Sequence, residues 1–361
     1  MSSRRRALFT RRALLVTNTV LAVLLLAGLI ALVSYLSPGG AVVRGGKVAS
    51  GLRPLLTVTG PGRGHYPVFV RPMSAAFGPD GRIHVLDTGN DRVVVLDRDG
   101  RYELEFGGFG AVKPLAGFEP SWSEGRMNHP LGIDVDEDGN IYVADLRNDQ
   151  IQVFNQEGIF LRRFPDPVEV VGEGASGQGG TGIAVADVAV AGGLVFAVDT
   201  SQVVVFTTGG EFVRQFDRAA SDAVEFDRIS GVDATEDGRV YVVDSGNTRI
   251  LALSAEGELV WSVGKSRDGD AGPPAVPPVS PYEFGLPRSI AVMADGTVAV
   301  LDALESSVVL FTRDGAFMGR YGVGGSNPAE FAGPSSIDAR GDLLLVSDTG
   351  NHRIQVVEVV R

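Results

Sequence analysis

The sequence contains no cysteine. Disulfides, thiol catalysis and cysteine-bound zinc are therefore excluded, and the redox compartment is left open. Lysine and glutamine, which favour helices, are sparse, whereas valine and the 48 glycines are abundant, and this balance favours strands and tight turns. There is no Gly-x-Ser-x-Gly nucleophile elbow and no phosphate-binding loop. The chain thus has the composition of a β protein without a recognisable catalytic motif.

Basic residues are also scarce relative to acids. The 361 residues include 32 Lys and Arg against 44 Asp and Glu, a formal net charge of −12. Five arginines precede residue 13, in a segment without acids, so the remainder has 27 bases against 44 acids, a formal −17. Because nucleic-acid binding draws on basic patches, no nucleic-acid partner is expected. This charge suits a solvated extracytoplasmic domain or one that binds cations.

Residues 13–36 contain no charged side chain. At about 1.5 Å per residue this segment spans about 36 Å, enough to cross a hydrocarbon core of about 30 Å. It is longer than the apolar region of about 7–15 residues in a cleavable signal, so we expect a transmembrane signal anchor. The positive-inside rule makes residues 1–12 a cytoplasmic basic tail and places everything after Ser37 outside the cell membrane. Arg11 and Arg12 also resemble a twin-arginine export signal, which leaves cleavage and export route open.

Residues 37–52 form a predicted linker, and six similar units follow it. In five units an Asp lies six residues after a turn glycine, and in the last the spacing is one residue longer. These aspartates are Asp87, Asp145, Asp199, Asp244, Asp302 and Asp348. Period-2 apolar runs separated by glycine turns predict four antiparallel strands per unit. Repetition of such units about an axis predicts a β-propeller.

The two ends of the repeat region predict how the ring closes. The last unit ends at Arg361 after its third strand, whereas residues 54–60 resemble an isolated fourth strand before the first unit. An open solenoid would leave two unpaired edges and needs capping repeats, which we do not find. We therefore predict an all-β, six-bladed propeller over residues 53–361, with the N-terminal strand closing the last blade and one transmembrane helix preceding it.

Several units resemble the NHL repeat, a six-bladed propeller family. The similarity rests on Pro130-x-Gly-Ile-x-Val135, Asp138-Gly-x-Ile-Tyr-Val-Ala-Asp145, Asp244-x-Gly-Asn-x-Arg249 and Asp348-x-Gly-Asn-x-Arg353, and it covers about residues 51–361. Units three and five depart from the pattern after Asp199 and Asp302. A propeller behind a membrane anchor is similar to the sensor half of some receptor-like bacterial kinases, which implies signalling through a separate partner.

The recurrent Asp-x-x-Asn-x-Arg turns are interpreted as structural. Asp and Asn side chains cap turns, and Arg pairs with a nearby carboxylate. A motif repeated in most blades also lacks the asymmetry of an active site. The residues given this role are Asp87, Asn90, Arg92, Asp145, Asn148, Asp244, Asn247, Arg249, Asp348, Asn351 and Arg353.

No cofactor is required by any motif, but one segment has calcium-loop spacing. Asp134, Asp136 and Asp138 alternate before Gly139, and Asp145 takes the twelfth place. The same Asp138-Gly139 pair is also the ordinary hairpin turn of the repeat, so both interpretations stay open. The resemblance to propeller lyases further implies a role for channel histidines, but His65, His84, His129 and His352 show no metal-ligand spacing.

Three insertions, at 108–128, 166–186 and 265–286, join the last strand of one blade to the first of the next. They are expected on the face that carries the Asp-x-x-Asn turns. Loops on a rigid scaffold often bind ligands, and exposed aromatic and arginine side chains anchor interfaces. The predicted ligand-binding residues are Phe118, Trp122, Arg126, Tyr282 and Phe284.

The first functional hypothesis is a membrane-anchored, extracytoplasmic recognition scaffold or sensor, without catalysis, for a protein, peptide or glycan. The alternative is a metal-assisted lyase or lactonase with carboxylates around the channel, as the resemblance to propeller enzymes implies. RNA binding, found in some cytoplasmic NHL proteins, conflicts with both the predicted anchor and the negative charge.

Overall fold

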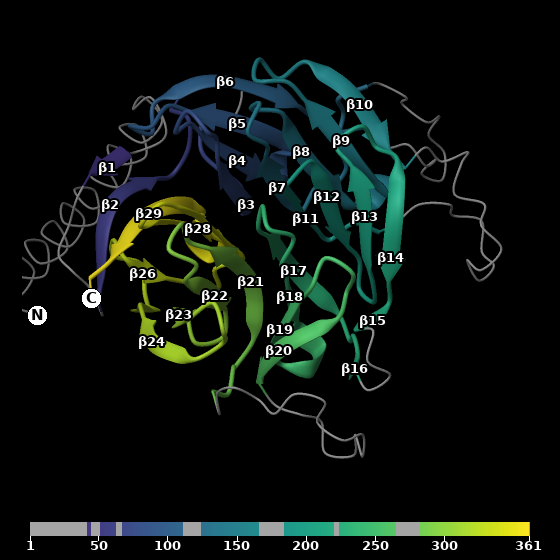
Figure 1. The fold of residues 1–361 in the computed structure, drawn as a ribbon. Helices are drawn as coiled ribbons and strands as arrows, with labels where there is room; N and C mark the ends of the chain where they lie inside the picture. The colour runs from purple at the N-terminus through teal and green to yellow at the C-terminus, as the bar shows by residue number, and fades with distance from the viewer. Residues whose placement is uncertain are drawn as a thin grey trace, which may run out of the picture.

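The computed structural model describes residues 42–44, 51–62, 67–110, 124–165, 184–219, 224–264 and 282–360. Within these residues six antiparallel sheets of four or five strands surround a common centre, and the chain passes from each to the next (Figure 1). The first strand of each sheet lies innermost, and the fourth lies on the rim. The predicted all-β, six-bladed propeller is confirmed.

The first three blades follow one another along the chain with one strand order. Blade 1 comprises β3 (Pro72–Phe77), β4 (Ile83–Asp87), β5 (Arg92–Leu96) and β6 (Tyr102–Gly107). Blade 2 comprises β7 (Gly132–Val135), β8 (Ile141–Asp145), β9 (Gln150–Phe154) and β10 (Phe160–Phe164). Blade 3 comprises β11 (Asp187–Ala191), β12 (Leu194–Val198), β13 (Val203–Thr207) and β14 (Phe212–Phe216).

The last three blades repeat this order, and the sixth takes strands from both chain ends. Blade 4 comprises β17 (Ile229–Ala234), β18 (Val240–Asp244), β19 (Arg249–Leu253) and β20 (Leu259–Gly264). Blade 5 comprises β21 (Pro287–Val292), β22 (Val298–Asp302), β23 (Ser307–Phe311) and β24 (Phe317–Tyr321). Blade 6 comprises β27 (Ser336–Arg340), β28 (Leu343–Asp348), β29 (Arg353–Val359), β2 (Leu52–Val58) and β1 (Val42–Arg44).

Two short ladders and four turns complete the described elements. The ladders pair β15 (Arg218–Ala219) with β16 (Val224–Glu225), and β25 (Val323–Gly324) with β26 (Glu330–Phe331). The turns are the 3-10 segments η1 (Thr88–Asn90), η2 (Leu146–Asn148), η3 (Ser245–Asn247) and η4 (Thr349–Asn351). Each turn ends on a residue in the left-handed conformation, with φ between 50° and 54°.

The middle strands are apolar along their whole length because both faces of each sheet are covered by a neighbouring blade. Every residue of β8 and of β18 is buried. A strand buried on both faces reads as a continuous Val/Ile-rich run rather than an alternation. The outermost strands meet solvent, and Phe212 and Phe317 are exposed there. Six core clusters lie between the blades, one for each junction.

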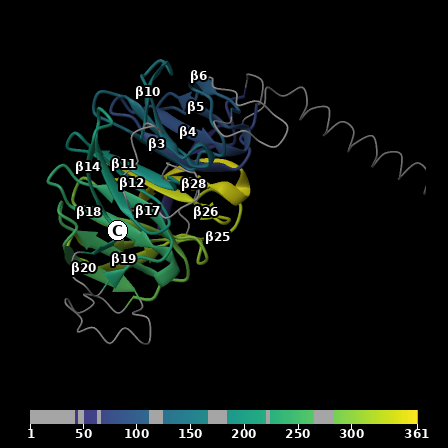
Figure 2. The same ribbon diagram turned by 90° about the vertical axis from the view of Figure 1, so that its right-hand side faces the viewer.

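The ring closes as predicted, through the N-terminal strand. β2 pairs antiparallel with β29, from Leu52 opposite Val359 to Val58 opposite Ile354. The inner strand β27 of the last blade contacts β3 of the first, and both views show these blades side by side (Figure 2). The segment interpreted as a linker holds an additional short strand, β1, which pairs with the outer edge of β2.

The predicted transmembrane anchor, residues 13–36, lies outside the described residues, as does the basic tail before it. Across the part of the chain that the structure describes, no helix has the length and apolar character needed to cross a membrane.

Candidate functional site

The repeated turn holds a buried carboxylate in a fixed network. In blade 4 the Asp244 side chain is 0% exposed and accepts hydrogen bonds from Asn247 Nδ2 and Arg249 Nε, both at 2.8 Å. It also accepts the backbone N–H of Asp227, at 2.8 Å, from the loop that enters the blade. One carboxylate therefore ties the entering loop to the turn and to the next strand.

Blades 1, 2 and 6 contain the same network with small changes. Asp87 binds Val70 N, Asn90 and Arg92, and Asp348 binds Ala332 N, Asn351 and Arg353. In blade 2, where Arg is absent, Asp145 binds Asn128 N, Asn148, Gln150 and Gln152. All these carboxylates are buried, which places the repeated residues in the scaffold.

Blades 3 and 5 keep the aspartate but replace its partners. Asp302 accepts the N–H groups of Gly285 and Leu286 at 2.7 and 2.9 Å. Among the described residues, Asp199 binds Ser201 and Gln202 in its own turn. The departures from the repeat sequence after Asp199 and Asp302 therefore change the hydrogen bonds of these turns, but blades 3 and 5 still form.

The predicted ligand residues are scattered in the structure. Phe118 and Trp122 lie outside the described residues. Arg126 is exposed and donates to Gly107 O at 2.9 Å. Phe284 is 7% exposed, and Tyr282 stacks on Phe317 with ring centroids 5.1 Å apart. Tyr282 and Phe284 therefore pack on blade 5 instead of projecting from the surface.

The four aspartates with calcium-loop spacing are not brought together. Asp134 lines the channel, and Asp138 is exposed on the hairpin turn. Asp136 closes that turn by accepting from the backbone N–H and the side-chain Nδ2 of Asn140. Asp145 is the last residue of β8 and lies at the opposite face of the propeller, about 13 Å along the strand from its first residue, Ile141. Among the described residues no group of three His, Cys, Asp or Glu is placed to hold a metal ion.

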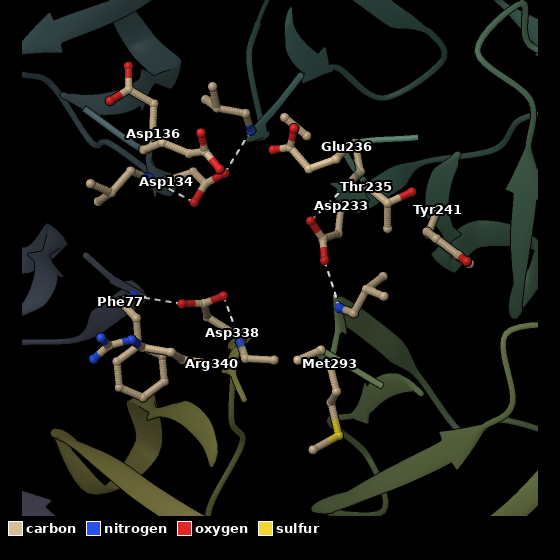
Figure 3. A pocket seen from close by; sticks show the side chains of 18 of the residues that line it. Phe77, Asp134, Asp136, Asp233, Thr235, Glu236, Tyr241, Met293, Asp338 and Arg340 are labelled. Atoms are coloured by element: carbon tan, nitrogen blue, oxygen red, sulfur yellow. Dashed lines mark hydrogen bonds between the residues drawn. The ribbon is translucent and has the colours of Figure 1, made fainter. Parts of the chain in front are cut away.

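A cavity of about 680 Å³ opens on the face formed by the hairpins between first and second strands. This is the face opposite the Asp-x-x-Asn turns. We call this cavity the funnel; all six blades line it, and it contains the ends of β7, β17 and β27 (Figure 3). Toward the middle of the propeller the channel narrows to a space of about 30 Å³. A volume of that size accommodates a water molecule but no larger ligand.

Three aspartates on alternate blades point into the funnel: Asp134 of blade 2, Asp233 of blade 4 and Asp338 of blade 6 (Figure 3). We call them the channel carboxylates. Each binds the inner strand of the following blade through Oδ2, which accepts from Val190 N, Val292 N and Phe77 N respectively, at 2.6–2.7 Å. Each Oδ1 accepts the N–H of the next residue in its own strand. The channel carboxylates therefore join neighbouring blades in pairs.

Burial makes the charged form of these groups costly. Removal from bulk water raises the pKa of Asp233 to about 7 and that of Asp338 to about 6. The pKa of Asp134 is raised well above its ordinary value by burial and then by the charges of Asp338 and Asp233. The hydrogen bonds from the inner strands oppose these increases. Negative charge in the funnel is thus incompletely compensated by the protein.

The rim of the funnel adds five acids and two bases. The acids are Asp136, Glu137, Glu236, Asp237 and Asp295. Of the bases, Arg313 forms an ion pair with Asp237. Arg340 extends away from the channel carboxylates in Figure 3 and donates to Pro79 O at 3.0 Å. Apolar wall is contributed by Val135, Val292 and Met293, so the funnel is an acidic cavity with apolar sides.

The described histidines lie away from the funnel. His84 is 3% exposed inside blade 1, where burial lowers its pKa to about 4. His129 and His352 lie on the opposite face, near Arg71, whose N–H donates to His352 Nδ1. Burial lowers the pKa of His129, and the charges of Arg147 and Arg71 lower it further. His65 lies outside the described residues.

Sequence reasoning predicted a binding face at the insertions and did not identify the funnel, which opens on the opposite face. Of the channel carboxylates it singled out Asp134 alone, and for another reason. The signal was present: Gly132-Ile-Asp-Val135, Gly231-Val-Asp-Ala234 and Ser336-Ile-Asp-Ala339 each place one Asp inside an apolar inner strand. A charged residue in such a strand is rarely buried without a partner.

The fold and repeat pattern are matched by known proteins. The NHL repeat model matches residues 127–154 and 331–357. "Protein brain tumor" of Drosophila melanogaster is 27% identical over 172 residues, covering 46% of this chain and 14% of that protein. NHL repeat-containing protein 3 of Homo sapiens is 26% identical over 140 residues, covering 37% of this chain and 36% of that protein. The chain thus spans well under half the length of these relatives.

Solved structures match the whole propeller. A gluconolactonase from Xanthomonas campestris superposes with a TM-score of 0.58 at 13% identity, over 90% of this chain and 99% of that one. Virginiamycin B lyase from Staphylococcus aureus gives 0.52 at 11% identity, over 90% and 97%. At such identities the similarity shows the fold alone. The protein is a six-bladed β-propeller that contains NHL repeats.

Proposed function

We propose that this chain is a recognition propeller, without catalytic activity, that binds a positively charged segment of a protein or peptide in the funnel. The observation that carries this proposal is the convergence of the three channel carboxylates beneath an acidic cavity of about 680 Å³. A cation between them would offset the mutual repulsion that raises the pKa of Asp134.

The dimensions and lining of the funnel favour a lysine or arginine side chain. Cavities of about 300–1,000 Å³ are the usual size for ligand sites. The apolar wall at Val135 and Val292 can pack against an alkyl stem, while the carboxylates below accept hydrogen bonds from its charged end. The acidic rim would attract such a segment before it enters.

Isothermal titration with acetylated trilysine amide at pH 7 tests this function. The wild-type protein should bind the peptide and release protons, because a bound cation favours the ionised carboxylates. Asp233→Asn should weaken binding about tenfold or more, since a hydrogen bond to a charged group contributes roughly 1.5–3 kcal/mol. Titration in two buffers of different ionisation enthalpy measures the protons released.

Asp314→Asn is the matched control, because Asp314 is exposed on the turn between β23 and β24 and does not line the funnel. It should bind the peptide like the wild type, and triglutamate should bind to neither. The proposal fails if the wild-type protein does not bind trilysine, or if Asp233→Asn binds it equally well while retaining the wild-type melting temperature.

We also propose that the propeller is held at the cell membrane with its N-terminus in the cytoplasm. This part rests on the uncharged segment 13–36 and the five arginines before it. Fusion of a reporter that is active only in the cytoplasm to either end distinguishes the two sides: activity is expected at the N-terminus and none at the C-terminus.

A lyase or lactonase function is the second candidate. Its support is a carboxyl group in a cleft with a pKa of about 7, Asp233, which suits general acid–base chemistry near neutral pH. Hydrolysis or elimination on simple lactones, abolished in Asp233→Asn and unaffected in Asp314→Asn, would favour catalysis over recognition. Addition of calcium to both proteins in the same assay tests the metal dependence.

A further inference from the structure

Five of the six junctions between blades share one packing feature. At five junctions an aromatic ring on the fourth strand of one blade covers a turn glycine at the start of the next blade's fourth strand. The pairs are Phe106 on Gly158, Phe164 on Gly210, Phe216 on Gly257, Trp261 on Gly315 and Tyr321 on Gly51. These glycines have positive φ, and a side-chain atom of the ring lies within 3.0 Å of where each Cβ would be. Aromatic rings thus fill these junctions.

The junction between blade 6 and blade 1, where the ring closes, has no aromatic cover. There the turn glycine Gly100 is met by Val58 and Leu56. In the sheet of blade 6, Leu56 lies opposite Val356. In blade 4 the residue equivalent to Val356 is Ala252, and Trp261 lies opposite it. A leucine therefore occupies the register at which blade 4 has a tryptophan. A cavity of about 300 Å³ opens at this closing junction, and it shares Phe77 and Arg340 with the lining of the funnel.

The cavity has an apolar floor and a basic rim. The floor includes Leu55, Leu56, Ile83 and Val356, contributed by both blades. Three arginines and one acid, Asp99, stand at the rim. This excess of positive charge contrasts with a chain of formal charge −12.

The three arginines differ in how far their charge is offset. Arg44 pairs with Asp99 at 3.0 Å. Arg340 lies against Gly81, and among the described residues it donates to the carbonyl oxygen of Pro79. Arg98 is exposed and makes no hydrogen bond or ion pair within the described residues. Two guanidinium groups are thus available to an anion at the mouth of an apolar cavity.

We propose that the closing junction is a binding site for a small amphipathic carboxylate, with its apolar body on the leucine floor and its anionic group between Arg98 and Arg340. Guanidinium groups bind carboxylates through paired hydrogen bonds, and an apolar body that enters the cavity leaves water. Arg340 and Phe77 line both cavities, but the ligand proposed for the funnel carries the opposite charge.

Octanoate, used below its micellar concentration, is the probe, and the full-length protein in non-ionic detergent is the sample. The wild-type protein should bind octanoate in isothermal titration, and octanol more weakly. Leu56→Trp should remove binding, because it places in the cavity the ring that blade 4 has at this register. Arg98→Ala should weaken binding roughly tenfold, the loss expected for one charged hydrogen bond.

Arg101→Ala is the control, because Arg101 pairs with Asp97 and Asp99 on the same turn and does not line the cavity. It should bind octanoate like the wild type, and Leu56→Trp should still bind trilysine if the funnel functions as proposed. Absence of octanoate binding by the wild type overturns the site. Undiminished binding by Arg98→Ala overturns it as well, whether or not Leu56→Trp folds.

Discussion

Asp244 shows how one residue type supports a whole blade. Its carboxylate is fully buried, and its partners among the described residues are all local: the entering loop, the turn and the first residue of the next strand. A buried charge is tolerated only when it is paired and hydrogen-bonded. Arg249, whose side chain is 13% exposed, depends on Asp244 for its counter-charge.

Replacing Asp244 by alanine should lower the free energy of unfolding by about 3 kcal/mol or more, because it leaves a nearly buried arginine without its partner. Urea denaturation measures the change. Asp199→Ala is the comparison, since Asp199 is only partly buried and its partners within the described residues lie in its own turn. It should cost about 1 kcal/mol. Equal losses in the two variants would contradict the structural role of the Arg-containing turns.

At the scale of elements, β2 decides whether the ring is closed. It contributes Leu52 to the core between blades 5 and 6, and Leu56 and Val58 to the core between blades 6 and 1. It also covers the edge of β29, which would otherwise present unpaired backbone groups. A seven-residue strand far from the last blade in sequence thus completes two cores.

A chain that begins at residue 67 should therefore lose cooperative unfolding and associate through the exposed edge of β29. Size-exclusion chromatography and thermal unfolding report these two effects. A chain that begins at Gly51 keeps β2 and should remain a monomeric propeller with one transition. If the shorter chain also gives one sharp transition at the same temperature, β2 is not needed for closure.

Most elements were predictable because the signal in each unit is local. Glycine turns and Val-rich runs predict the strands, and six copies of an Asp that follows a turn glycine by six or seven residues predict the blade number. Two features of the structure were not predictable in this way. Strand β1 has only three residues between glycine-rich segments, too few for a periodic pattern. The aromatic insertions suggested exposed ligand residues, but Phe284 packs in the core, since an aromatic residue near a strand is equally suited to cover one.

The site was less predictable than the fold because it is a property of the ring. Asp134, Asp233 and Asp338 are about 100 residues apart in the sequence, and only the closed propeller brings them to one level of the channel. The cavity at the closing junction likewise follows from comparing six junctions in space. The single sequence contains Leu56 but does not show which glycine it covers.

For the whole molecule, the channel carboxylates link stability to pH. Burial raises the pKa of the channel carboxylate Asp233 to about 7 in the folded state, and also that of Asp187, which lines the narrow part of the channel below the funnel. Their contribution to stability is fully present below the ordinary aspartate pKa and is lost as pH rises through about 7. His84, whose folded-state pKa is lowered, acts in the opposite direction mainly below pH 6.5.

We therefore expect the free energy of unfolding to fall by about 1 kcal/mol between pH 6.5 and pH 8. Asp233→Asn should show a smaller fall, because one of the titrating groups is gone. Urea titrations at the two pH values measure both. A wild-type stability that increases over this range, or an unchanged pH dependence in Asp233→Asn, would contradict the raised pKa values.

Closure by β2 also determines how the molecule responds to force. The residues before β1 lead into β1 and then into β2, so tension applied at the amino end reaches the backbone hydrogen bonds between β2 and β29 before it reaches any turn of blade 1. Blades 2 to 5 each consist of consecutive strands and lie outside this path. Tension at the amino end would therefore loosen the two junctions of blade 6, with blades 5 and 1, and leave the others packed.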